Sequence, residues 1–124
     1  MVLDASALLA LINSEPGWKV VAATLPEAAI SAVNLAEVVT KMVDIGIPEE
    51  DAWAEAADLV PLIIGFGPEL ARATAGLRVM TRPLGLSLGD RACLALAQQL
   101  HLPALTADTA WRRLSIGVEI RYLR

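Results

Sequence analysis

Short apolar runs alternate with longer helical patterns along the 124 residues of this chain, and that alternation limits the folds open to it. We expect strands at Met1–Asp4, Ala28–Ser31, Leu62–Phe66, Ala104–Thr106 and Val118–Tyr122. The spacing of apolar residues and of glycine and proline predicts helices at Ala5–Asn13, Trp18–Leu25, Val33–Ile45, Pro48–Leu59, Pro68–Val79, Leu88–His101 and Thr109–Leu114. Such alternation predicts one α/β domain over residues 1–124, a three-layer α/β/α sandwich with a central, mainly parallel sheet.

The composition is unusually apolar for a small domain. Hydrophobic residues make up 56% of the chain and aromatic residues only 4%, so the core must be built of alanine, leucine, valine and isoleucine. This apolar surplus suggests that a partner covers part of the surface. No run is suited to spanning a membrane, the first residues lack a basic signal-peptide region, and one cysteine cannot form an internal disulfide. We therefore expect a cytoplasmic protein without membrane contact.

The charges are divided unevenly between the two parts of the chain. Residues 1–68 carry ten acids and two bases, whereas residues 69–124 carry four acids and eight arginines. The overall net charge of −4 argues against a protein that coats nucleic acid without selectivity. It leaves room for a local groove lined with arginine.

Four acids stand where the pattern changes from strand to helix: Asp4, Glu37, Asp90 and Asp108. In open parallel sheets, binding sites form at the carboxyl ends of strands, so these acids can share one cleft. Carboxylates held close together raise one another's pKa, and a divalent cation relieves the repulsion. Oxygen ligands favour Mg²⁺ or Mn²⁺ over Zn²⁺. The pattern indicates metal-dependent phosphodiester hydrolysis by an activated water molecule.

Each acid also has a purely structural interpretation. Asp4 can cap the helix after it, and Asp108 can cap the short helix that begins beside it. Glu37 can pair with Lys41 one turn further along its helix. Ser87–Asp90 fits a capping box, a role that is compatible with Asp90 facing a cleft. The residues alone leave both interpretations open.

Smaller polar residues near the acids are candidate supports for the site. Asn34 precedes Glu37 by one turn on the same helix face. Thr106 can hydrogen-bond a metal ligand or cap the turn at Asp108, and Gly89 leaves room for the backbone of a ligand.

Four blocks of the sequence resemble the signature blocks of PIN-domain ribonucleases, and among these the VapC-type toxins of bacteria. The blocks are Val2–Ser6, Ser31 with Asn34–Glu37, Ser87–Ala97 and Leu105–Trp111. They occur in the family's order and cover the whole chain. The resemblance implies a PIN-like fold with a central parallel sheet and an Mg²⁺- or Mn²⁺-dependent RNA endonuclease.

The resemblance also implies roles for single residues. Asp4, Glu37, Asp90 and Asp108 would be the metal-binding acids, with Ser6 and Thr106 as supporting polar residues. Many members of the family carry a further acid one turn after the third, and here Arg91–Leu94 has none. The choice between one metal ion and two therefore stays open.

The resemblance further implies an RNA substrate, a cognate antitoxin and a homodimer. Arg91 is expected to neutralise the acids in part or to meet a phosphate. The arginines of the second half are candidate RNA contacts or ordinary surface charges: Arg72, Arg78, Arg82, Arg91, Arg112 and Arg113. The alternative is a non-catalytic PIN-like protein that acts by binding a protein partner. A phosphotransfer domain of receiver type would need an aspartate at the end of a middle strand, and Leu62–Phe66 has no acid there.

Overall fold

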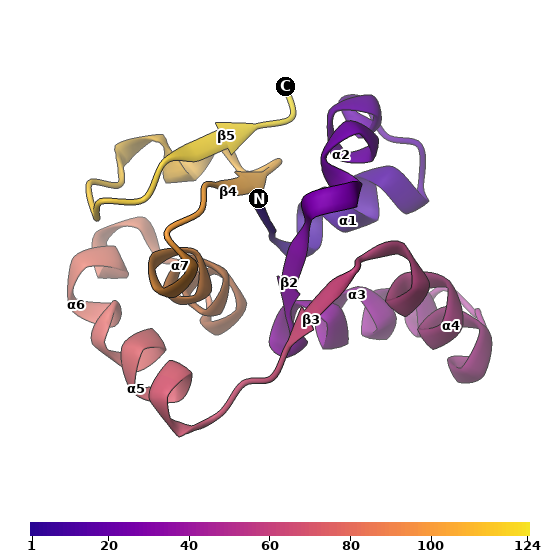
Figure 1. Ribbon diagram of the computed structural model, residues 1–124, viewed down its shortest axis with the longest axis horizontal. Helices are drawn as coiled ribbons and strands as arrows, with labels where there is room; N and C mark the ends of the chain where they lie inside the picture. Colours follow the sequence, from indigo (N-terminus) through magenta and orange to yellow (C-terminus); the bar gives the residue numbers. More distant parts are fainter.

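Five parallel strands form the sheet in the computed structural model, which describes residues 1–124 (Figure 1). They are β1 (Val2–Leu3), β2 (Ala29–Ser31), β3 (Leu62–Ile64), β4 (Ala104–Thr106) and β5 (Ile120–Tyr122). Their spatial order is β3-β2-β1-β4-β5, and all four pairings are parallel. The predicted α/β sandwich with a central parallel sheet is confirmed.

Helices cover both faces of this sheet. The first four are α1 (Ala5–Ile12), α2 (Trp18–Thr24), α3 (Ala32–Asp44) and α4 (Glu49–Leu59), on the right in Figure 1. On the left are α5 (Pro68–Gly76), α6 (Arg78–Thr81) and α7 (Leu88–Leu100). Short 3₁₀ helices are η1 (Leu25–Glu27), η2 (Arg82–Leu84) and η3 (Thr109–Arg113). None of the helices has the length and apolar character that crossing a membrane requires.

One predicted helix differs from the structure. The pattern predicts a single helix over Pro68–Val79, but the chain bends at Leu77, which separates α5 from α6. Gly76 ends α5, and a glycine near a helix end weakens its continuation. The bend keeps Leu77 in the core, where only 6% of it is exposed, while Val79 in α6 is 73% exposed.

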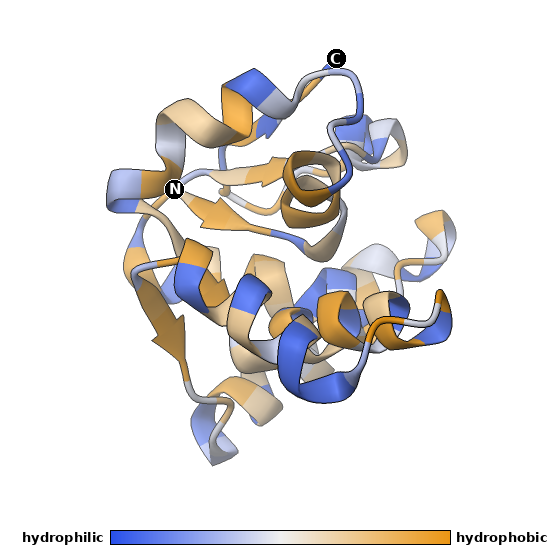
Figure 2. Cartoon of the chain, turned by 90° about the vertical axis from the view of Figure 1, so that its right-hand side faces the viewer, coloured by the Kyte–Doolittle hydropathy of each residue, from blue (hydrophilic) through white to orange (hydrophobic).

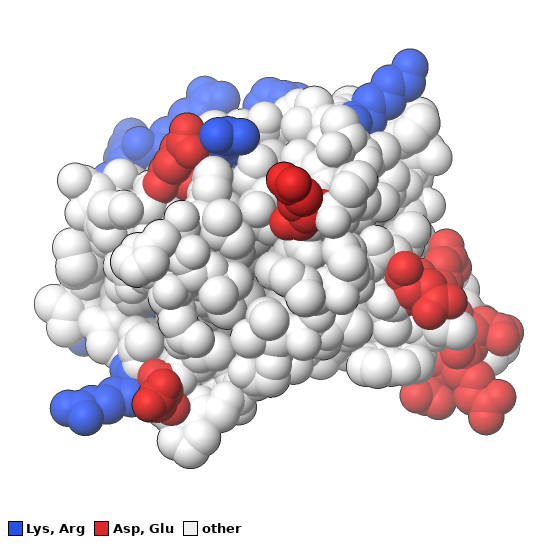
Figure 3. All heavy atoms as spheres, in the orientation of Figure 1, with Lys and Arg blue, Asp and Glu red and all other residues white.

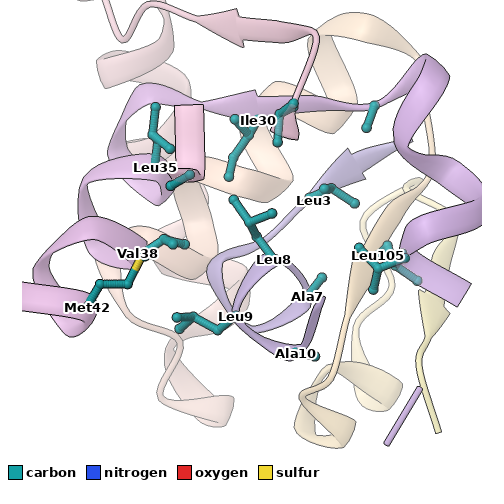
Figure 4. Close-up of a cluster of buried hydrophobic side chains, with 14 of the residues drawn as sticks. Leu3, Ala7, Leu8, Leu9, Ala10, Ile30, Leu35, Val38, Met42 and Leu105 are labelled. Atoms are coloured by element: carbon teal, nitrogen blue, oxygen red, sulfur yellow. The ribbon is translucent and has the colours of Figure 1, made fainter. Parts of the chain in front are cut away.

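Alternate residues of the central strands enter two separate cores. Leu3 and Leu105 pack against α1 and α3 in the cluster that Figure 4 shows, together with Leu8 and Val38. The preceding strand residues enter the second core, beneath α5 and α7. Because both faces of the central strands are covered, the first two residues of β1, β2 and β4 are apolar and fully buried, and polar residues enter only at the carboxyl ends of β2 and β4, at Ser31 and Thr106. Figure 2 shows the apolar character of the chain by colour.

The order of the strands reverses direction at the end of β1. The chain passes from β1 to β2 and β3 on one side, then returns to β4 and β5 on the other. Ligands of open α/β sheets bind outside the carboxyl ends of the strands at such a reversal. Side chains at this edge cap three helices, Asp4 for α1, Ser31 for α3 and Ser87 for α7. The fold thus brings the first turns of three helices to one edge of the sheet.

Charge is distributed over opposite parts of the surface. Acidic side chains gather where α4 lies, and basic side chains line the edge near β5 and the carboxyl terminus (Figure 3). The acids of α4 are Glu49, Glu50, Asp51, Glu55 and Asp58, all exposed. The uneven division of acidic and basic residues along the sequence is therefore also a separation of charge on the surface.

Candidate active site

Asp4 is the buried centre of the candidate site. It follows β1 directly, and only 4% of it is exposed. Its Oδ1 accepts hydrogen bonds from Ser6 Oγ at 2.6 Å and from the Ala7 backbone N–H at 3.0 Å. Its Oδ2 accepts a hydrogen bond from Thr106 Oγ1 at 2.7 Å. The predicted cap of α1 is confirmed, and the carboxylate is also tied to the end of β4.

Burial dominates the titration of Asp4. It raises the pKa of this carboxyl above its usual range, and the negative charge of Asp90 adds to the rise. Hydrogen bonds from Ser6, Thr106 and Ala7 stabilise the charged form and oppose the rise in part. No base pairs with Asp4, since the one ion pair of the structure joins Arg121 to Glu119. A buried acid in this state favours either a proton or a cation.

Glu37 lies on α3 with its carboxylate against the first turn of α7. Asn34 Nδ2 donates to Glu37 Oε1 at 2.8 Å and to the backbone oxygen of Gly89 at 2.9 Å. The alternative pairing with Lys41 does not form. Asn34 is buried, and its amide joins the two helices directly. Glu37 is therefore oriented toward α7, not along its own helix.

Gly89 has a role that the sequence interpretation assigned wrongly. The space beside its α carbon was expected to admit the backbone of a ligand, but the carboxylate of Glu37 fills it. A Cβ atom at Gly89 would stand 2.5 Å from both Cδ and Oε2 of Glu37 and closer still to Oε1. Glycine within a helix costs up to about 1 kcal/mol relative to alanine. That cost is the sequence signal that could have identified Gly89 as a packing partner.

Asp90 forms the predicted capping box at the start of α7. Its Oδ2 accepts from the Ser87 backbone N–H at 2.9 Å, and Ser87 Oγ accepts from the Asp90 N–H at 3.1 Å. One turn later, the fully buried thiol of Cys93 has a pKa raised well above its usual range. Burial is the main cause, and the charges of Asp4, Asp90 and Glu37 add to it. The charges of all three acids thus act on one buried thiol of α7.

Asp108 is joined to this group through its backbone. Its N–H donates to Thr106 Oγ1 at 2.9 Å, and Thr106 in turn donates to Asp4. The Asp108 carboxylate serves a different element, because its Oδ1 accepts from the Ala110 N–H at 2.9 Å and caps η3. Burial is the main reason why the pKa of Tyr122 is raised. The charge of Arg112 lowers that pKa, and the charge of Asp108 adds to the rise.

The arginines lie apart from the three acids. Arg91 Nη1 donates to the backbone oxygen of Thr74 on α5 at 3.1 Å, and Arg91 makes no ion pair with Asp90. Neighbouring residues of a helix point in different directions, which explains why Arg91 faces α5. Arg112 and Arg113 are exposed on η3.

The donor set agrees in kind with a hard divalent cation. Asp4, Glu37 and Asp90 offer only oxygen, and no base neutralises them. As the side chains stand, no three acids lie at the spacing of ligands around one ion. Glu37 Oε2 and Asp90 Oδ1 accept no protein hydrogen bond, and both residues are half-buried. Each of these two carboxylates therefore keeps one oxygen available to a cation while its other oxygen is held by the protein.

Residues 1–117 match the family described as the PIN domain. The chain belongs to the PIN-domain family. This match covers the β1 end, the α3 acid, the first turn of α7 and the end of β4, which together form the site described above. No curated protein matches the sequence.

Solved structures with the same fold are known from several bacteria. A toxin–antitoxin complex from Klebsiella pneumoniae has 22% identity and a TM-score of 0.71, covering 96% of this chain and 98% of that one. DNA-bound VapBC from Salmonella typhimurium has 16% identity and a TM-score of 0.74, with 99% and 97% covered. The sarcin–ricin loop cleaving toxin VapC20 of Mycobacterium tuberculosis has 16% identity and a TM-score of 0.74, with 94% and 97% covered. At these identities the likeness establishes the PIN fold alone.

Proposed function

We propose that this protein is an endoribonuclease that uses Mg²⁺ or Mn²⁺ and an activated water molecule to cleave RNA phosphodiester bonds. The observation that carries the proposal is Asp4, a buried carboxylate without a basic partner at the switch point of a PIN-domain sheet. Glu37 and Asp90 add two further unpaired acids from α3 and α7. An arrangement of acids that costs stability when charged is typical of a site built for a cation.

The surrounding side chains fix the acids that would hold the ion. Ser6 and Thr106 hold the two carboxylate oxygens of Asp4 in place. Asn34 directs Glu37 toward the first turn of α7. The capping box fixes the backbone of Asp90. The predicted role of Asp108 is that of a metal ligand or of a residue that orients water. A divalent ion bound there would lower the pKa of a water molecule and stabilise charge on the phosphoryl oxygens.

Cleavage of structured RNA in the presence of Mn²⁺ or Mg²⁺ tests this proposal. We expect turnover by the wild type and none by Asp4→Asn or Asp90→Asn, because each variant removes one negative ligand. Glu119→Gln is the matched control, because Glu119 lies near the carboxyl terminus in an exposed ion pair with Arg121. This variant should cleave RNA at the wild-type rate. Equal cleavage by all four proteins would reveal a contaminating nuclease and remove the assignment.

We further propose that the nuclease is a VapC-type toxin, forms a homodimer and is inhibited by a cognate antitoxin. Several solved structures of the same fold contain toxin–antitoxin or VapBC assemblies, which supports this role. Exposed apolar side chains also favour coverage by partners, since Ile45 and Val79 are 72% and 73% exposed. Induced expression should arrest growth, and co-expression of a small neighbouring gene should restore it. Normal growth on induction would contradict the toxin role.

One observation favours the second candidate, a non-catalytic PIN-like protein that acts by binding a protein partner. No three acids stand at ligand spacing in the structure. The two functions differ in a direct titration with Mn²⁺. The nuclease should bind the ion through Asp4 and lose that binding in Asp4→Asn, whereas the binding protein should show neither ion binding nor RNA turnover.

A further inference from the structure

A pocket lies beside the candidate active site, on the surface of η3. Its volume is about 450 Å³, and we name it the η3 pocket. It is lined by Leu84, Asp108, Thr109, Ala110, Arg112 and Arg113. Two hydrogen bonds connect it to the buried acid, from the Asp108 N–H to Thr106 Oγ1 at 2.9 Å and from Thr106 Oγ1 to Asp4 Oδ2 at 2.7 Å. The pocket is therefore held in a fixed position relative to the site.

The two arginines of the η3 pocket are available to an anionic ligand. Both are exposed, and neither forms an ion pair within the protein. The guanidinium carbon of Arg112 stands 5.0 Å from the ring centroid of Tyr122, which orients the side chain without neutralising it. The Asp108 carboxylate is occupied by the Ala110 N–H, and the lining as a whole keeps one net positive charge. Guanidinium groups in this state suit phosphate oxygens.

The distribution of charge over the molecule favours one direction of approach for a polyanion. The five acids of α4 repel a polyanion from the part of the surface on the lower right of Figure 3. The basic edge near β5 lies on the opposite part of the molecule, and η3 contacts β5. A nucleic-acid strand that reaches Asp4 is thus attracted over η3 and excluded from α4.

We infer that the η3 pocket binds backbone phosphates of the RNA strand next to the scissile bond, so that substrate lies across η3 and away from α4. Arg112 and Arg113 make the contacts, and Tyr122 holds Arg112 in place. The inference rests on the proposed nuclease function and specifies where its substrate binds. Because phosphate carries no sequence information, the pocket sets the position and orientation of the RNA, not the choice of bases.

The salt dependence of RNA affinity tests the inference. Binding of a labelled single-stranded RNA is followed by fluorescence anisotropy in an Asp4→Asn background, which removes cleavage. Each phosphate contact to a single strand contributes about 0.7 to the slope of log affinity against log salt, so Arg112→Gln/Arg113→Gln should reduce the slope by about 1.4. Between about 50 and about 200 mM salt, the parent should then lose about sevenfold more affinity than this variant.

Matched variants separate local contacts from net charge and from misfolding. Arg72→Gln/Arg78→Gln makes the same charge change at exposed sites of α5 and α6 and should keep the parental slope. Arg112→Lys/Arg113→Lys keeps the charge and should keep most of the slope. If the double glutamine variant does not fold, Arg113→Gln alone should reduce the slope by about 0.7.

The outcomes distinguish this inference from the proposed function. A parental slope in the Arg112/Arg113 variants, or an equal fall in the α5–α6 control, overturns the η3 pocket even if the wild type cleaves RNA. A selective fall supports phosphate binding in the η3 pocket. If the wild type then cleaves no RNA, the nuclease proposal and the position next to a scissile bond are lost, and the pocket remains an RNA-binding site. Competition by polyglutamate as effective as competition by RNA would mark a site for acidic proteins and overturn the inference.

Discussion

Replacing Gly89 by alanine should separate the activity of this protein from its stability. The new Cβ would stand 2.5 Å from Cδ and Oε2 of Glu37, well inside van der Waals contact, so the carboxylate must move by about 1 Å or more. The Glu37 carboxylate stands at the end of a flexible, half-buried side chain and can turn toward solvent. The backbone of α7 therefore need not shift.

The energetic terms of this substitution nearly cancel. Alanine gains at most about 1 kcal/mol over glycine in a helix, the value for a helix interior, and Gly89 lies in the first turn. Moving the Glu37 carboxylate loses the 2.8 Å hydrogen bond from Asn34 Nδ2, a part-buried interaction worth about 1 kcal/mol. We expect the free energy of unfolding of Gly89→Ala, measured by urea denaturation, to stay within about 1 kcal/mol of the wild-type value.

Activity should respond very differently. A displacement of about 1 Å at a reacting centre can lower a rate about a hundredfold, so RNA cleavage with Mn²⁺ should fall by about that factor. Gly76→Ala is the matched control, because a Cβ at Gly76 meets nothing within 4 Å. That variant should cleave RNA at the wild-type rate. If Gly89→Ala also cleaves at that rate, the position of Glu37 against α7 is not part of the mechanism.

Three further predictions concern the buried groups of the site. Because the folded pKa of Asp4 is raised, the stabilising effect of its proton is present below the ordinary aspartate range and lost as pH rises through the folded pKa. Asp4→Asn should remove that loss, so its melting temperature in chelator should exceed the wild-type value at neutral pH, and a lower value would contradict the burial argument. Asn34→Ala should reduce the free energy of unfolding by about 1 to 3 kcal/mol in urea titrations, and no change would show that its bridge to Gly89 is dispensable. Cys93, fully buried with a raised pKa, should react with a thiol reagent only after denaturation, and rapid labelling of the folded protein would refute that placement.

Local patterns were sufficient for the order of elements and for the helix caps. The strand Ala104–Thr106 has the predicted bounds, and the capping box at Ser87–Asp90 is present with both of its hydrogen bonds. Such features depend on residues that are only a few positions apart in the sequence. These residues stay close to one another whatever the rest of the fold is. The bend at Leu77 was missed because Gly76 only weakens the helix locally, and the burial of Leu77 in the core decides that the chain turns there.

Within the candidate site, the partners of each side chain were harder to predict than the side chains themselves. The relation of Asn34 to Glu37 follows from helical spacing and is confirmed by their hydrogen bond. The fit of Glu37 over Gly89 joins residues of two different helices, and no local pattern contains it. Arg91 is adjacent to Asp90 in sequence, yet its guanidinium binds Thr74 on another helix.

The sequence by itself determined which acids stand at the starts of helices and the ends of strands, because capping, apolar periodicity and chain breaks act over a single turn. The tertiary structure alone decided that the charges of Asp4, Glu37 and Asp90 act on one buried thiol of α7, while the Asp108 carboxylate caps η3. That choice depends on the order of the strands and on the packing of α3 against α7, which fix distances between residues far apart in the chain.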